Sequence, residues 1–140
     1  MSPAPTSAPA LALRAAVHAA LAADTALLAL LGGPRVHDLP PPTPAFPYVT
    51  LGEAQITDWS TATERGQEHR LTLHAWSRQG GHREVHAVAE AVQQVLHDAA
   101  LVLEGCRLVN FRLSSAEIRR EAGGTLYHAL IRFRAVLETS

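Results

Sequence analysis

Residues 47–77 read PYVTLGEAQITDWSTATERGQEHRLTLHAWS, and this stretch decides the fold. Two segments within it, 48–57 and 70–76, are rich in β-branched and aromatic residues, which is typical of β-strands. The polar connection between them, Asp58–Glu68, is longer than a tight hairpin needs. A long polar connection held by two strands is a frequent place for function. Trp59 within it is the kind of side chain that anchors an interface. A mobile loop without a role is the alternative.

Apolar side chains repeat with helical spacing on both sides of this stretch. Leu13, Val17 and Leu21 form one stripe of a first helix, and Asp24 is placed to cap a second, short one. Beyond the stretch come an amphipathic helix and two more strands, separated by a glycine pair that predicts a turn. The expected elements are helices from about Pro9, at 25–31 and at 82–99, and strands at 48–57, 70–76, 107–118 and 125–138.

This order, α-α-β-β-α-β-β, predicts an α+β domain with an antiparallel four-stranded sheet and helices packed on one face. Residues 35–39 are a possible minor strand, and Pro40–Pro44 is interpreted as an extended spacer. We expect residues 1–8 to be a flexible tail and residues 9–140 to be a single domain.

Alternation along the strands assigns their two faces. Leu71, Leu73 and Ala75 point to the core, as do Val109, Phe111 and Leu113 and the residues from Tyr127 to Leu137 at every second position. The opposite face is expected to be open and partly apolar, which suggests a partner surface. It carries Trp76, Leu126, Leu130 and Val136. Arg132 and Arg134 share that face, where they either pair between subunits or are simply solvated.

The composition narrows the range of functions. The chain has 140 residues, 47% of them hydrophobic, a net charge of −1 and no lysine. Such a charge does not direct a protein to nucleic acid or to an anionic membrane. Cys106 is the only cysteine, which excludes an intramolecular disulfide and suits a reducing cytoplasm. The apolar run 11–31 is interrupted by Arg14, His18 and Asp24, so we interpret it as helix of a soluble protein rather than a membrane span.

Histidines offer the one candidate for metal chemistry. His82 and His86 are four residues apart on one helical face, with Glu90 a turn further on. Arg83 stands where a zincin has its catalytic glutamate, and a solvated helix face explains the pattern better. A small metal-dependent hydrolase using His82 and His86 therefore remains only an alternative. The other histidines are scattered, and the sequence contains no nucleophile elbow or phosphate loop. We expect no catalytic residue, no metal and no cofactor.

Three segments resemble one family. They are PYVTLGE at 47–53, the DWST cluster at 58–61 and EHRLTLHAWS at 68–77. The chain is similar, from about Leu11 to Leu137, to the tail terminator, or tail completion, proteins of long-tailed phages and gene transfer agents. The resemblance implies a structural assembly protein of α+β fold. Its copies would close into a hexameric ring that ends the tail tube and meets a head-side connector or stopper protein. Another neck component is the alternative.

The resemblance also implies a setting and a site. DNA would pass through the lumen without specific binding, and no membrane would take part. Assembly would occur in the cytoplasm, and the finished protein would lie in the tail or neck of the particle. The predicted partner-binding residues are Asp58, Trp59, Ser60, Thr61, Thr63, Glu64, Arg65, Arg132 and Arg134.

Overall fold

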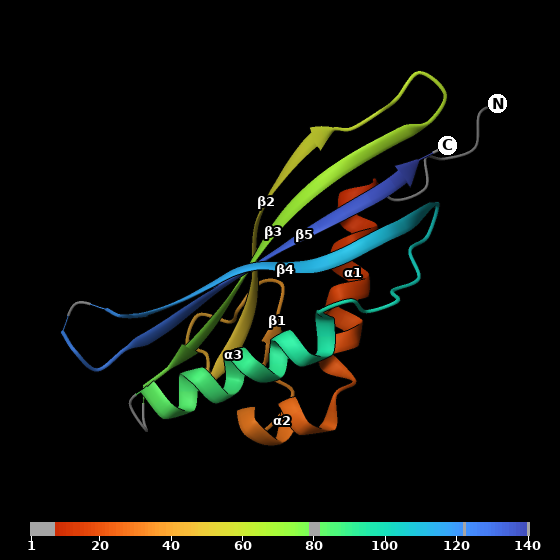
Figure 1. Cartoon of the computed structure of the whole chain (residues 1–140). Helices are drawn as coiled ribbons and strands as arrows, with labels where there is room; N and C mark the ends of the chain where they lie inside the picture. The colour runs from red at the N-terminus through yellow and green to blue at the C-terminus, as the bar shows by residue number, and fades with distance from the viewer. Residues whose placement is uncertain (1–7, 79–81, 122, 140) are drawn as a thin grey trace.

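The computed structural model describes residues 8–78, 82–121 and 123–139. Most of the tail predicted at 1–8 therefore lies outside the described residues. So does Gly80-Gly81, a glycine pair that by sequence favours the end of the strand before it. Figure 1 shows the elements in space. The helices are α1 (Pro9–Ala22), α2 (Thr25–Leu31) and α3 (His82–Leu96). The strands are β1 (Val36–His37), β2 (Tyr48–Asp58), β3 (Arg65–Ser77), β4 (Cys106–Arg120) and β5 (Tyr127–Thr139).

The strands form one sheet in the order β1-β2-β3-β5-β4. Its four long strands are antiparallel to their neighbours, as predicted. The prediction of a wholly antiparallel four-stranded sheet is nevertheless wrong. The possible minor strand near 35–39 is real, and Val36–His37 pairs parallel with Val49 and Thr50. The result is a mixed five-stranded sheet, because the proline-rich connection after β1 returns the chain to run beside it in the same direction.

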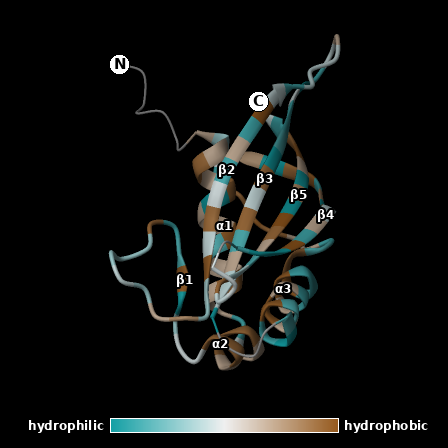
Figure 2. Cartoon of the chain, turned by 90° about the vertical axis from the view of Figure 1, so that its left-hand side faces the viewer, coloured by the Kyte–Doolittle hydropathy of each residue, from teal (hydrophilic) through white to brown (hydrophobic). Residues whose placement is uncertain are grey.

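The helices pack on one face of this sheet and enclose the core. Leu13, Val17 and Leu21 of α1 are buried, as the stripe predicts. They meet the buried apolar side chains of α3 and of the strands. Figure 2 shows how hydrophobic and hydrophilic residues follow one another along the strands. Asp24 caps α2, since its carboxylate accepts a hydrogen bond of 2.9 Å from the Leu27 amide. The α+β class and the helical elements are thus correctly predicted.

Two local predictions are wrong. Helix α3 ends at Leu96 rather than near residue 99, because Asp98 has a φ of 56° that no α-helix continues. Strand alternation assigns Val109 to the core, but its side chain is 43% exposed. A β-bulge between Leu108 and Asn110 shifts the pairing with β5. An extra residue in one strand reverses the faces beyond it. Leu108 packs against the core instead.

The face of the sheet without helices is less open than the alternation implies. His128, Leu130 and Val136 on β5 are buried. β5 is a central strand, and side chains of β3 and β4 flank it on both sides. Leu130 and Val136, which alternation predicts to be open, are therefore buried, whereas Trp59 and Val109 are exposed.

Within the described residues, no single helix is long and apolar enough to cross a membrane. α1 and α2 together match a span in length and composition, but the chain bends by 77° between them. Their buried apolar side chains, which include Val17 and Leu27, lie in the core of the domain.

Candidate functional site

The connection between β2 and β3 forms a projecting tip, visible at the top of Figures 1 and 2. It is shorter than the predicted Asp58–Glu68 loop. β3 begins at Arg65, so Gly66, Gln67 and Glu68 belong to the strand and only residues 59–64 connect. The Trp59 amide donates to the Gly66 carbonyl over 2.9 Å, which extends the ladder into the tip. The polar sequence suggests a loop, but the strand pairing with β2 and β5 continues through it.

Hydrogen bonds within the tip fix its shape. The Ser60 hydroxyl donates to Asp58 over 2.7 Å and accepts from the Gly66 amide over 3.2 Å. The Thr61 hydroxyl accepts from the Glu64 amide over 3.0 Å, and the Thr61 amide donates back to the Glu64 carbonyl over 2.8 Å. These contacts constrain the conformation of the turn. A preorganised loop loses less entropy on binding than a mobile one.

Trp59 is the one large apolar side chain of this tip, and 53% of it is exposed. The Arg134 guanidinium carbon lies 5.5 Å from the centre of the indole ring, which is a cation–π distance. Arg134 also donates to Glu68 over 2.7 Å, and Arg70 donates to the same carboxylate over 3.0 Å. The hydrogen bond from Arg134 is the main reason that the pKa of Glu68 is lowered. Arg134 thus packs against the indole ring, and its hydrogen bond to Glu68 fixes the position of its guanidinium group.

Beside Trp59 lies a hollow of about 90 Å³ on the same face. Val109 and Val136 line it together with Arg65 and the stem of the tip. Val109 reaches this surface only because of the bulge in β4, which strand alternation alone does not reveal. Trp59, Val109 and the hollow make a small apolar surface with a charged rim, which is the usual composition of an interface core. We call Trp59, Val109 and the other residues that line this hollow the tip surface.

The predicted site residues do not all meet there. Thr63, Glu64 and Arg65 are exposed on the tip itself. Arg132 lies two residues from Arg134 towards the middle of the sheet, opposite Thr72 and Ser115, and forms an ion pair of 3.6 Å with Glu117. The structure therefore joins Arg134 to the tip and separates Arg132 from it.

The same face carries a histidine pair that the sequence pattern does not predict. His74 Nδ1 and His128 Nε2 are 2.6 Å apart, although 54 residues separate them in the chain. Trp76 stacks on His128 at 3.7 Å between ring centres, and Glu121 lies 3.0 Å from His128 Nδ1. Burial lowers the pKa of His128, and Glu121 opposes this effect only in part. The pairing of Trp76 with His128 brings these rings together; no local pattern reveals a contact between strands so distant in sequence.

Two buried histidines predict a pH-dependent stability. Burial also lowers the pKa of His69, whose Nδ1 has no hydrogen-bond partner in the described part of the chain. Because both folded-state pKa values are below the unfolded value near 6.5, the unfolded chain binds more protons as the pH falls through this range. We expect the melting temperature to fall between pH 7.5 and 5.5. A His69→Leu variant should lose less over that range, and the exposed-site control His86→Gln should behave like the unchanged chain. An equal decrease of the melting temperature between pH 7.5 and 5.5 in all three proteins would contradict this prediction.

The alternative metal site receives no support from the geometry. The rings of His82 and His86 are 5.9 Å apart, and His86 and Glu90 are exposed. Among the described residues, no group of three His, Cys, Asp or Glu side chains is close enough to hold a metal ion. Burial raises the pKa of Cys106, which disfavours its thiolate. The absence of a metal and of a catalytic residue stays a prediction.

The fold and this geometry define a class of protein, a small α+β domain whose β2–β3 hairpin ends in an exposed aromatic side chain. Comparison with known proteins identifies the family. The profile of the family described as tail completion protein gp17 matches residues 15–138. The chain belongs to this family, and its role is a structural one in the assembly of a phage-type tail.

Two known proteins resemble this chain. Tail completion protein gp17 of Bacillus phage SPP1 is 25% identical over 97 residues, which cover 68% of this chain and 70% of that protein. A chain in the solved structure of the virion of a native gene transfer agent particle is 36% identical. That match covers 95% of this chain and 99% of the other, with a TM-score of 0.87. The likeness therefore extends over nearly the whole domain.

Proposed function

We propose that copies of this chain close into a hexameric ring that ends the tail tube and joins it to a head-side connector or stopper protein. The observation that carries this proposal is the tip surface. Trp59 is exposed, yet hydrogen bonds and Arg134 hold it in place. A monomer gains little from such an arrangement, whereas an assembly gains a preformed anchor. The similarity to a chain of a gene transfer agent virion supports the same setting.

The residues of the tip have different parts in this proposal. Trp59, Thr63, Glu64 and Arg65 are exposed and contact the partner directly. Asp58, Ser60 and Thr61 shape the tip through their own hydrogen bonds. Arg134 supports the indole, and Arg132 contributes to subunit contacts away from the tip. The occupant of the tip surface is the last ring of tail tube protein or the neighbouring subunit.

The proposed ring also implies how the protein relates to DNA, to the membrane and to cofactors. DNA passes through its lumen, and the net charge of −1 gives no general attraction that would retard the passage. Subunits assemble in the cytoplasm and end in the neck of the particle, without a membrane. Neither a metal nor a cofactor takes part.

Particles made without this chain test the proposal. We expect tails of irregular length that are not joined to heads, because nothing caps the tube. Electron microscopy of lysates measures the fraction of heads with tails and the spread of tail lengths. Restoration by the unchanged chain is the control. Normal joined particles in its absence would refute the proposed function.

A further inference from the structure

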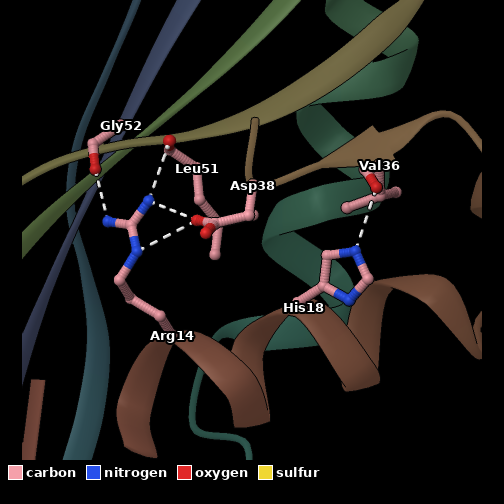
Figure 3. A network of polar contacts seen from close by, with 6 residues as sticks. All are labelled: Arg14, His18, Val36, Asp38, Leu51 and Gly52. Atoms are coloured by element: carbon pink, nitrogen blue, oxygen red, sulfur yellow. Dashed lines mark hydrogen bonds and ion pairs between the residues drawn. The ribbon is translucent and has the colours of Figure 1, made fainter. Parts of the chain in front are cut away.

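The two outer long strands of the sheet contain segments without a partner on their outer edge, and the first lies on β2. β1 pairs only with Val49 and Thr50. Just beyond, Arg14 donates to the carbonyls of Leu51 over 3.1 Å and Gly52 over 2.6 Å, while Asp38 holds its guanidinium (Figure 3). This cover ends there. Residues 53–58 are all exposed. Residues 54–58 pair only with β3, and Glu53 lies in the β-bulge between Leu51 and Ala54.

The second unpaired segment lies on β4, the opposite outer strand. The segment after α3 covers its middle, where the Asp98 amide donates to the Phe111 carbonyl over 2.9 Å and the Leu113 amide donates to His97 over 3.1 Å. Beyond this cover, Ser114 lies in a β-bulge and residues 115–120 pair only with β5. All residues from 114 to 120 except Ile118 are exposed. Unpaired strand edges invite pairing with another chain unless something blocks them.

The two free segments carry opposite charge. Residues 53–58 contain Glu53 and Asp58 and no basic residue. Residues 114–120 contain two arginines and one glutamate, and the glutamate already pairs with Arg119 over 3.0 Å. Arg120 has no ion pair in the part of the chain that the structure describes, and Glu53 has only His74, at 3.6 Å. An acidic edge and a basic edge on one chain suit a second copy of that chain.

We propose that residues 53–58 of one copy pair antiparallel with residues 114–120 of the next, and that Glu53 faces Arg120. This inference rests on the proposed function, because it supplies the head-to-tail contact of the ring. β2 and β4 run in opposite directions within the sheet. A copy that extends the sheet, with its helices on the same side, therefore sets its β2 antiparallel to β4. That direction places Glu53 at the Arg120 end of the contact.

The covered middle of β4 also determines the stagger. Within one subunit, Ile56 of β2 pairs with His69 of β3, and His69 pairs with Ala135 of β5. Ala135 pairs in turn with Phe111 of β4, so Ile56 and Phe111 lie at the same level along the strands. Phe111 is covered, so a neighbour cannot add its β2 at that level. It must shift along the strands to reach residues 114–120. Repeated contacts of this heterologous kind form either a closed ring or a helical filament.

Charge reversal at the two ends of the contact tests the pairing. In particles that depend on the variant, Glu53→Arg and Arg120→Glu should each lower the fraction of joined heads and tails at least about tenfold, because like charges then meet at every interface. Co-production of the two single variants should restore joining, since an alternating ring contains only matched pairs. The double variant Glu53→Arg/Arg120→Glu should restore it as well. Arg83→Glu, an exposed reversal on α3, should have no effect.

The outcomes separate this proposal from the proposed function. Circular dichroism of each purified variant shows whether it is folded. If removal of the chain impairs joining but the single variants support it normally, the edge pairing is wrong and the function stands. Folded single variants that fail, and that neither co-production nor the double variant rescues, would also refute the pairing. If removal of the chain leaves joining intact, both proposals fail.

Discussion

Replacement of Phe133 by alanine is expected to lower the free energy of unfolding by about 3–5 kcal/mol. Phe133 is fully buried, and its ring stacks on Phe111 at 5.0 Å between centres. Removal of the ring leaves a cavity at the centre of the sheet, where β3, β4 and β5 meet and cannot readily collapse. Urea unfolding followed by circular dichroism measures the loss.

Arg132→Ala is the matched control for this change. Arg132 precedes Phe133 on the same strand but lies on the opposite face, with one ion pair to Glu117. An exposed pair of this kind contributes at most about 1 kcal/mol. Its removal should leave the fold nearly unchanged and affect assembly alone. Equal losses of stability in the two variants would show that the assignment of the faces is wrong.

Replacement of Trp59 by alanine should have the opposite pattern, a folded subunit that does not assemble. Half of the side chain is already exposed. The monomer therefore loses little more than the contact with Arg134, about 0.5–1 kcal/mol for an exposed cation–π pair. An indole buried at an interface can contribute ~2 kcal/mol or more. In a ring this loss recurs at every copy, so closure or docking should fail and tails should remain unterminated or headless.

Circular dichroism of the purified variant measures whether it is folded. Electron microscopy of the particles measures whether tails are terminated and joined to heads. Leu39→Ala is the control, because it removes another exposed apolar side chain at a distance from the tip surface. Normal particles with the Trp59 variant would refute the role of the tip. An unfolded variant would show instead that Trp59 is required for the stability of the domain.

Patterns of short period predict most of this fold. The stripe of α1, the Asp24 cap and the core face of β5 follow from the nearest neighbours of each residue in the chain. The failures arise where distant segments meet. The parallel pairing of Val36 and His37 depends on how the proline-rich connection returns, and the bulge at Val109 depends on the partner strand. Neither has a local signal.

The site is predictable only in part for the same reason. Trp59 stands out in sequence because it is an aromatic residue among small polar ones, and the structure leaves it exposed. The support that Arg134 and Glu68 provide comes from pairing between β3 and β5 and is invisible in the sequence. The predicted loop is too long because the Gly66–Glu68 segment is polar, although its neighbours in the sheet make it strand.

Electron cryomicroscopy of the tail end in intact particles tests the central claim most directly. We predict a closed ring of copies of this chain between the last tube ring and the head-side connector. We further expect Trp59 to be buried at one of these contacts. A tail end without such a ring, or a ring in which the tip surface remains exposed to solvent, would contradict this expectation.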